Sequence, residues 1–377
     1  MTLGALFEKT VFVLGAGASI DAGCRSSKQM LASLRTEIQE NVTDPEKQKQ
    51  FRAIYDFVMQ CLVFQHGLKN PNASIADVTN IEDFVAIIRQ IIDREFVIPA
   101  PLIANWNNKI IGWEMRNERV FDELLDFIFN CLVNKWVKHD SEKAKELVAP
   151  FLELIGQAEA FDLKIISLNY DLVFEGSLNS DRENLVETGF SQGRWHGDFE
   201  DPASPAKIKL FKLHGSVDWY FDEDVQEVLC GSYEGQRPAI VFGAGPKMQS
   251  FDPYLSLLAS ARQFMKKADL FVVIGYSFQD KYLNNILIQS LGADLNKKML
   301  VIDPGIDSSP TKFVEKVEEF QKSKSFNELL NFTKKINPER VEILKETAKD
   351  FFGNAFKDKA AFLAKKLEDT EAGGSIF

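Results

Sequence analysis

Glycines mark the first candidate site, the segment GAGASIDAG at residues 15–23. It follows Val11–Leu14 (VFVL), a short apolar run of mostly β-branched residues that is typical of a buried parallel strand. Gly15 and Gly17 permit a tight turn and let a phosphate approach backbone N–H groups at the start of a helix. Ile20 stands where the G-x-G-x-x-G fingerprint has its third glycine. The segment predicts a phosphate site or, alternatively, a turn that serves only strand–helix packing.

Two polar side chains, Asn169 and Asp171, occur in the segment SLNYDLVFE. They follow Lys164–Leu168 (KIISL), which predicts a strand, and ligands of open α/β sheets bind at the carboxyl ends of strands. An Asn side chain offers both a donor and an acceptor, so it can hold a ribose hydroxyl or a water molecule. The alternative is that both residues cap the helix expected to begin near Asp171.

A histidine, His214, occupies the third strand end. The chain has four histidines, His66, His139, His196 and His214. Only His214 lies between an apolar run, Lys207–Leu213, and a Gly-Ser turn. A neutral imidazole near pH 7 can accept a proton from a ribose hydroxyl or from water, which is the task of a general base. The alternative is a structural histidine.

Two further strand ends carry polar or glycine residues. The apolar run Leu270–Ile274 leads into Gly275 and Ser277, and the run Met299–Ile302 leads into Asp303. Gly275 allows a ligand to approach the backbone closely, and Ser277 adds a hydroxyl at the same edge. A carboxylate at Asp303 can contact a ribose or an adenine edge, or it can cap a turn.

The elements that must position these residues form an α/β pattern. A further strand is expected at Ala239–Phe242, and helical spacing begins at about Ala22. Between about residues 45 and 160 the sequence has long amphipathic segments and almost no strand pattern, which predicts a helical insertion. Beyond Pro310 the periodicity favours helices, including Val341–Phe352 and Ala355–Leu367.

The expected fold is therefore α/β, a Rossmann-like doubly wound parallel sheet with a large all-helical insertion and a helical C-terminal tail. We expect a catalytic domain over residues 1–305, interrupted by the insertion at about 45–160, and a helical extension over residues 306–377.

Composition and charge exclude several classes of protein. The chain has 377 residues, of which 45% are hydrophobic and 26% charged, as in a folded globular protein. The formal net charge of −11 argues against a broad basic face for nucleic acid. The apolar run at residues 96–104 is too short for a membrane span, and no signal peptide is evident. Four widely spaced cysteines indicate neither a zinc ribbon nor a disulfide framework, so we expect a cytoplasmic protein without a metal.

Taken in order, the segments GAGAS, NYD, LHGS, GYS and VIDP resemble the sirtuin-like NAD-binding fold, over roughly residues 10–40 and 160–305. Sirtuins have an arginine-bearing segment after the glycine loop, a Gln-Asn-x-Asp motif and a four-cysteine zinc module. This chain has GCRSSKQM, NYD and no zinc cysteines. In these departures, and in NIEDFV at residues 80–85, it resembles bacterial sirtuin-like effectors of antiphage defence, which hydrolyse NAD to nicotinamide and ADP-ribose.

The resemblance implies that NAD is the substrate and that no metal takes part. Asn169 would position the nicotinamide ribose or the attacking water, and His214 would be the general base. Asp21 would either cap the first helix or contact the nicotinamide side. The remaining residues implied in NAD binding are Gly15, Ala16, Gly17 and Ser19 at the pyrophosphate, Gly275 and Ser277 at the adenosine-side ribose, Asp303 at the adenosine end, and Asp171.

The implied function is an NAD glycohydrolase that depletes NAD in infected cells. The first alternative is an NAD-dependent protein deacylase. The missing zinc module and the helical insertion argue against it. The second alternative is a module that senses NAD or ADP-ribose without catalysis. The presence of both Asn169 and His214 argues against it.

Regulation is expected to come from assembly, because residues 306–377 are too few for a second sensing domain of ordinary size. The architecture resembles the effector subunit that assembles with a HerA-type ring ATPase. We expect a homo-oligomer larger than a dimer, or a complex with such an ATPase. With 31 Phe in the chain, apolar patches around Phe351, Phe352 and Phe356 would mark subunit contacts, unless these residues belong to the core.

Overall fold

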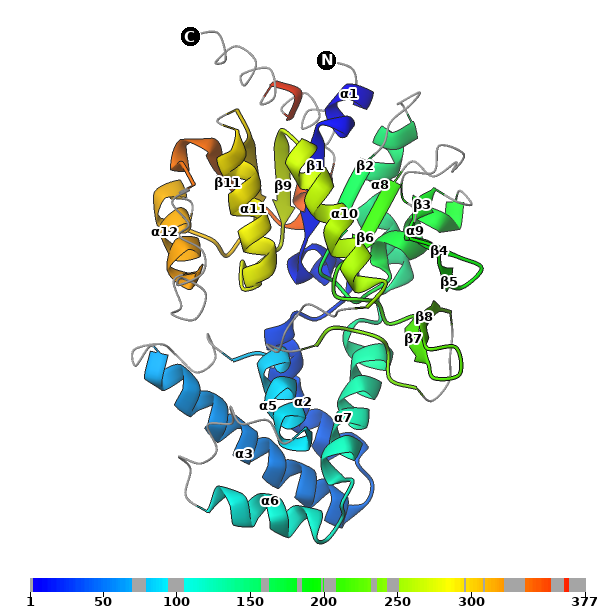
Figure 1. Cartoon of the computed structure of the whole chain (residues 1–377), viewed down its shortest axis with the longest axis vertical. Coiled ribbons are helices and arrows are strands. Elements are labelled where there is room, and N and C mark those ends of the chain that lie inside the picture. Colours follow the sequence, from blue (N-terminus) through cyan, green and yellow to red (C-terminus); the bar gives the residue numbers. More distant parts are fainter. Residues whose placement is uncertain are drawn as a thin grey trace. The chain divides into compact units, whose positions relative to one another are not determined.

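A computed structural model of the chain divides into two units (Figure 1). The first unit comprises Met1–Cys24, His139–Tyr233 and Met248–Phe377, and the second comprises Arg25–Lys138 and Glu234–Lys247. The residues that the structure describes are 3–69, 79–93, 105–156, 163–181, 185–197, 199, 208–231, 236–242, 251–294, 296–307, 309–321, 336–353 and 363–365.

A seven-stranded parallel sheet is the centre of the first unit. Its spatial order is β11-β10-β9-β1-β2-β6-β3, and every neighbouring pair is parallel. The strands are β1 (Thr10–Leu14), β2 (Leu163–Ser167), β3 (Val186–Glu187), β6 (Ile208–Lys212), β9 (Leu270–Ile274), β10 (Lys298–Ile302) and β11 (Val341–Leu344). Without the two-residue edge strand β3, the six strands have the 3-2-1-4-5-6 order of a Rossmann fold. The predicted doubly wound parallel sheet is confirmed.

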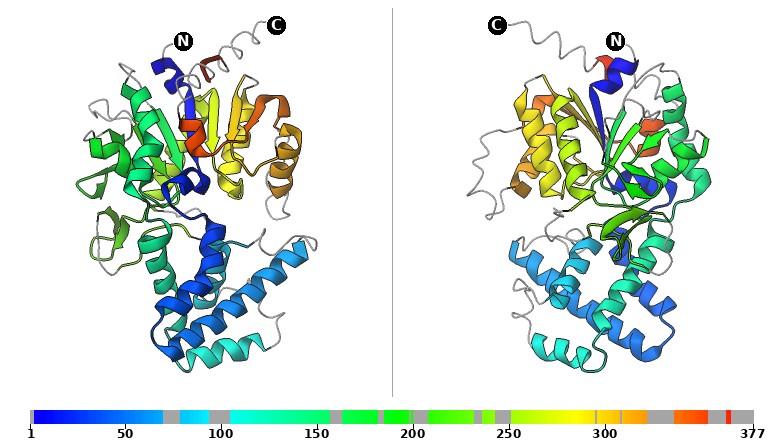
Figure 2. Two further views of the ribbon diagram at one scale, coloured as in Figure 1. Left: turned by 180° about the vertical axis from the view of Figure 1, so that it is seen from behind. Right: turned by 45° about the vertical axis from the view of Figure 1, so that its right-hand side comes forward.

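Helices cover both faces of this sheet (Figure 1, Figure 2). These helices are α1 (Leu3–Glu8), α8 (Ser141–Gly156), α9 (Val173–Asp181), α10 (Tyr254–Lys267), α11 (Lys281–Ala293), α12 (Pro310–Gln321) and α13 (Ala348–Phe352). Because both faces are covered, β1, β2 and β9 are buried along their whole length. This double burial explains why their sequences are apolar runs rather than alternating patterns.

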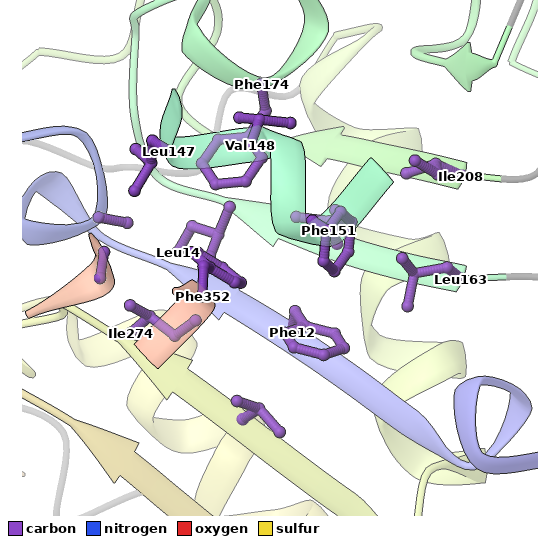
Figure 3. Packing of buried hydrophobic residues seen from close by; sticks show 14 of the residues in the cluster. Phe12, Leu14, Leu147, Val148, Phe151, Leu163, Phe174, Ile208, Ile274 and Phe352 are labelled. Carbon is purple, nitrogen blue, oxygen red and sulfur yellow. The ribbon is translucent and has the colours of Figure 1, made fainter. Parts of the chain in front are cut away.

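One apolar cluster fills the face of the sheet beneath α8, α9 and α13 (Figure 3). Phe12 of β1 contacts Phe151 of α8 edge to face, with ring centroids 5.8 Å apart. Phe352 of α13 lies 5.7 Å from Phe151 and 6.1 Å from Phe174, again between centroids. The C-terminal segment is thus part of the main core.

The C-terminal segment corrects two expectations. Val341–Leu344 forms strand β11, which pairs with β10, instead of the first turns of a helix over Val341–Phe352. Only the end of that range is helical, after Thr347 caps α13. Phe351 and Phe352 are buried at 0% and 1% exposure, so the expected apolar surface patch there is wrong. Phe356 lies outside the described residues.

The second unit is helical. Its helices are α2 (Ser27–Asn41), α3 (Pro45–Lys69), α5 (Ile81–Ile92), α6 (Trp106–Glu114) and α7 (Val120–Cys131), followed by a π-helical turn η3 (Leu132–Trp136). A capping box between Ser26 and Gln29 starts α2, five residues later than the expected start near Ala22. The reason lies in the first unit, where Ala16–Ala22 form a 3₁₀ helix (η1) that ends at Gly23 in the left-handed region, with φ 98°. The helical unit spans residues 25–138, so α8, which the sequence placed in an insertion at about 45–160, lies in the first unit.

The strand expected at Ala239–Phe242 is absent, and only Ile240 makes a single bridge among the described residues there. The segment instead packs on the helical unit, where the Phe242 ring lies 5.9 Å from that of Phe129. Arg237 anchors it through hydrogen bonds to Asp126 and Asp122 at 2.6 and 3.1 Å. An apolar run shows that a segment is buried, but not which element buries it.

A small antiparallel sheet in the first unit was not expected from the sequence. Its order is β4-β5-β8-β7, with strands β4 (Phe190–Ser191), β5 (Arg194–Trp195), β7 (Trp219–Asp222) and β8 (Glu227–Cys230). Strands of two to four residues are too short to show a period in the sequence. A helix long and apolar enough to cross a membrane is not found in the described parts of the chain.

Candidate functional site

The candidate residues gather at the carboxyl edge of the parallel sheet. Strands β6, β2, β1, β9 and β10 are neighbours in that order, and each ends in one of the predicted segments. Since parallel strands end at the same edge, the five segments share it. The strand order reverses between β1 and β9, which is the switch point where open α/β sheets bind ligands.

Three glycines bring the loops after β1 and β9 into direct backbone contact. A Cβ on Gly275 would lie 2.4 Å from the Cα of Gly17, and one on Gly15 would lie 2.5 Å from the Gly275 oxygen. The N–H of Gly15 donates to Ile274 O and that of Gly17 to Gly275 O, both at 2.9 Å. Gly275 also has a φ of 60°, which favours glycine. The glycines therefore hold two loops together at the switch point.

The same bonds limit how the glycine loop can receive a phosphate. The N–H groups of Gly15, Gly17 and Ala18 all donate to carbonyl oxygens of the chain. Ser19 is fully buried, and its hydroxyl oxygen accepts a hydrogen bond from Asn169. Ala16 is exposed. Phosphate binding by Gly15–Ser19 remains a prediction, with the backbone at Ala16 as the accessible part of the segment.

Asn169 joins the loop after β2 to the glycine loop. Its Nδ2 donates to the Gly15 oxygen at 2.9 Å and to Ser19 Oγ at 3.1 Å. Its own backbone N–H donates to Ser167 Oγ at 3.1 Å. The side chain is therefore fixed in orientation, and within the described part of the chain its Oδ1 accepts no hydrogen bond. That oxygen remains available to a ligand.

His214 forms a pair with Asp280, a residue that the sequence analysis did not assign. His214 Nε2 lies 2.8 Å from Asp280 Oδ2, and both side chains are at least nine-tenths buried. Asp280 Oδ1 accepts from the N–H groups of Tyr282 and Leu283, so it also caps α11. A carboxylate at Nε2 fixes the neutral tautomer with its proton on Nε2, which leaves Nδ1 as an acceptor. Nδ1 has no partner among the described residues.

The loop from Gly275 to Asp280 is held in an uncommon conformation. Phe278 has a φ of 57°, which is rare for a bulky residue and costs roughly 1–3 kcal/mol. The Tyr276 hydroxyl accepts from the N–H of Asp280 at 3.2 Å and contacts Asn284 Oδ1 at 2.8 Å. These bonds place Asp280 toward His214 and leave Ser277 exposed. Ser277 is thus accessible at the edge where the sequence places it.

Each of the three remaining carboxylates has an oxygen bound to backbone. Asp171 Oδ1 accepts from the N–H of Val173 at the start of α9, and Asp303 Oδ1 accepts from that of Gly305 at 2.7 Å. Asp21 does not cap α2, because its Oδ2 accepts from the N–H of Lys349 in the C-terminal segment. Their contact with NAD remains a prediction.

The Cys24 thiol is held in its neutral form by its surroundings. Burial, reinforced by the Asp171 carboxylate, raises the pKa of the Cys24 thiol far above its ordinary value. Within the parts of the chain that the structure describes, three or more His, Cys, Asp or Glu side chains do not gather as a metal site would require. The polar side chains that hydrogen bonds orient at this edge include those of His214, Asp280 and Asn169.

Asn80, at the start of the NIEDFV segment, has a structural task in the helical unit. Its Oδ1 accepts from the N–H of Asp83 at 2.9 Å and so caps α5. Its Nδ2 donates to Asp83 Oδ2 at 2.8 Å. This motif therefore fixes the start of a helix whose apolar face is buried.

A family model described as a SIR2-like domain matches residues 163–326. These residues are similar to a SIR2-like domain. The match includes Asn169, His214 and Asp280, but it covers less than half of the chain and omits the glycine loop at residues 15–23.

Solved structures of Sir2 proteins are also similar to the chain. One, described as "Structural Basis for the Mechanism and Regulation of Sir2 Enzymes", is 14% identical, with 97% of this chain and 96% of that chain covered and a TM-score of 0.38. Another, described as "Sir2-p53 peptide-NAD+", is 13% identical, with 96% and 100% covered and a TM-score of 0.38. No curated protein matches the sequence.

Proposed function

We propose that this protein is an NAD glycohydrolase that cleaves NAD to nicotinamide and ADP-ribose. One observation carries the proposal: a His214–Asp280 pair and an oriented Asn169 amide lie on neighbouring loops of the sheet edge. Ser167 of β2 and Lys212 of β6 are paired in register, and Asn169 and His214 each follow two residues later. The similarity of residues 163–326 to a SIR2-like domain supports NAD as the ligand.

The chemistry asks little of the protein beyond orientation and a base. In NAD the bond between the ribose anomeric carbon and the pyridinium nitrogen breaks, and its electron pair stays on nicotinamide, which leaves as a neutral molecule. Water adds to the anomeric carbon and loses a proton. His214 Nδ1 can accept that proton, or one from a ribose hydroxyl, and Asp280 stabilises the imidazolium that results. Asn169 Oδ1 can accept a hydrogen bond from a ribose hydroxyl or from the water.

The test measures nicotinamide released from NAD by the purified full-length chain. Both His214→Ala and Asn169→Ala should lower turnover by about 10²- to 10⁴-fold, the usual value of a general base or of an oriented substrate. His196→Ala is the matched control, because His196 is an exposed histidine of the same unit, near Glu187, and should leave turnover unchanged. Wild-type turnover in either site variant would overturn the assignment.

The same assay separates the alternative functions. Release of nicotinamide only when an acylated peptide is present would indicate a protein deacylase. Tight binding of NAD or ADP-ribose without any release would indicate a sensor. Release from NAD alone supports the hydrolase.

The biological setting is a further part of the proposal. The effector would act in the cytoplasm, deplete NAD during phage infection and be regulated by assembly as a homo-oligomer or with a HerA-type ring ATPase. This part depends on the sequence resemblance alone, since Phe351 and Phe352 lie in the core and mark no subunit contact. Light scattering on the chain, alone and mixed with a candidate ATPase, tests it. A monomer in both samples with full NAD cleavage would contradict regulation by assembly.

A further inference from the structure

Lys212, the last residue of β6, is a buried cation that the proposed chemistry does not use. Its side chain is 2% exposed. The ammonium group donates to the carbonyl oxygen of Asp171 and to the carboxylate of Glu175. Asp171 belongs to the loop that carries Asn169, and Glu175 belongs to α9, which follows that loop. One side chain of β6 therefore reaches both the loop after β2 and the helix beyond it.

The hydrogen bonds of Lys212 add to those that join the loop of Asn169 to the loop of His214. Two backbone bonds join the same loops, from Leu213 N–H to Ser167 O and from Val217 N–H to Tyr170 O, both at 3.0 Å. Along the chain, Asn169 lies between the two residues whose carbonyls accept these bonds, and His214 lies between the two residues whose N–H groups donate them. The hydrogen bond from the Lys212 ammonium group to Asp171 O is a third connection between the two loops, on the far side of Asn169. Of the three connections, it is the one that a side-chain substitution can remove.

The ion pair with Glu175 is not a simple source of stability. Burial raises the pKa of the Glu175 carboxyl, while the charge of Lys212 beside it lowers that pKa. Replacing a buried ion pair by apolar side chains of similar volume is often neutral or stabilising, whereas removing one partner alone is strongly destabilising. The pair, in which Lys212 is buried and Glu175 is mostly buried, is therefore better explained by the geometry that it fixes.

We propose that Lys212 is a positioning residue, which holds the Asn169 loop in register with the His214 loop so that both side chains meet the same ribose. This proposal rests on the proposed function for what the two side chains act upon. The ammonium group of Lys212 donates to neither His214 nor Asn169 in the described structure, so it would act on these side chains through the loops.

Lys297 provides a matched control on the opposite edge of the sheet. It is 4% exposed, and its ammonium group donates to two backbone carbonyls, those of Lys266 and Ala268. It directly precedes β10, so it lies at the amino end of the strands, away from the candidate site. Removal of Lys297 tests the loss of a buried ammonium group without any change at the carboxyl edge.

The experiment compares Lys212→Met/Glu175→Met with Lys297→Met in the full-length chain. The double variant leaves no buried charge without a partner, so we expect it to fold. Its kcat for NAD should fall by about 10- to 100-fold, the effect of a displacement on the order of 1 Å, with KM changed by less than about threefold. Lys297→Met should lower the melting temperature and leave kcat unchanged. A double variant with wild-type kcat, or an equal loss of kcat in Lys297→Met, overturns the proposal.

One further variant separates the charge of the ion pair from the contact of Lys212 with the Asp171 loop. Glu175→Gln removes the charge of the pair but keeps the Lys212 contact with the Asp171 carbonyl, so its kcat should stay within about threefold of wild type. A larger loss in a folded Glu175→Gln protein would contradict a role through the Asp171 loop.

An NMR readout separates this proposal from the proposed function. In ¹⁵N-histidine-labelled protein, the imidazole signals of His214, identified by their loss in His214→Ala, should shift in the double variant and not in Lys297→Met. If wild-type protein releases no nicotinamide, the proposed function fails while this shift still decides the role of Lys212. Unchanged His214 signals in the double variant overturn that role.

Discussion

Replacing Gly275 by Ala tests whether the contact between the loops after β1 and β9 builds the site. The added Cβ would lie 2.4 Å from the Gly17 Cα and 2.4 Å from the Ala18 nitrogen. Both are backbone atoms in the loop that also receives the Asn169 side chain through Gly15. Carbon atoms in contact prefer separations of about 3.5–4.0 Å, so one loop must move by about 1 Å.

Two costs add in this variant. Gly275 has a φ of 60°, and a left-handed conformation costs an Ala about 1–2 kcal/mol. Forcing a methyl group into a closely packed contact costs about 1–3 kcal/mol more. The free energy of unfolding should therefore fall by about 2–5 kcal/mol, a large part of the roughly 5–15 kcal/mol that stabilises an ordinary domain. Turnover should fall about 100-fold, because the glycine loop and Asn169 move with respect to His214.

Urea unfolding followed by circular dichroism measures the stability, and nicotinamide release measures the turnover. Gly112→Ala in α6 is the control, because nothing lies within 4 Å of its added Cβ. That substitution should stabilise the helix by about 0.5–1 kcal/mol and leave turnover unchanged. A Gly275→Ala protein with wild-type stability and turnover would refute the reasoning from close approach.

Three other predictions concern the base, the thiols and metals. Asp280→Asn keeps an oxygen to cap α11 but presents an amide N–H to His214 Nε2, which favours the wrong tautomer of the imidazole. We expect kcat to fall by about 10²- to 10⁴-fold while the circular dichroism spectrum stays unchanged. A smaller loss of kcat would show that Asp280 does not belong to the site. Burial raises the pKa of Cys61 and that of Cys131 to about 11. Both thiols should therefore react with a thiol reagent at pH 8 only after unfolding, and fast reaction of the native protein would contradict their burial. A chelator should leave NAD cleavage unchanged, whereas activity lost to a chelator and restored by zinc would reveal a metal site.

Positions of the candidate residues in the fold were predictable because buried parallel strands have a strong sequence signal. The runs before Gly15, Asn169, His214, Gly275 and Asp303 are each apolar, short and followed by polar or glycine residues. All five are strands of one sheet, in the register that brings their ends together. Topology then supplies the site, since parallel neighbours must end at one edge.

Other features depend on contacts distant in sequence, which local patterns do not encode. Ala239–Phe242 has the composition of a strand but packs on α7 through Phe242 and Phe129. Val341–Leu344 adds to the edge of the sheet because β10 offers an unpaired partner there. Asp280 stands directly before α11 in the sequence and caps that helix with one carboxylate oxygen. Its second oxygen lies within hydrogen-bond distance of His214, 66 residues earlier in the chain. A cap signal is local, whereas the pairing with His214 is a tertiary contact.

Hydrogen-bond polarity predicts which groups of the proposed ligand, NAD, would lie near His214. Asn169 uses its donor group inside the protein and leaves Oδ1, while His214 uses Nε2 inside the protein and leaves Nδ1. Both atoms left for a ligand are acceptors, so they suit groups that donate, such as ribose hydroxyls and water. A pyrophosphate has only acceptor oxygens there and would be repelled by this pair. If the protein binds NAD as proposed, we expect a ribose and the attacking water between Asn169 and His214, and the phosphates near the exposed backbone at Ala16.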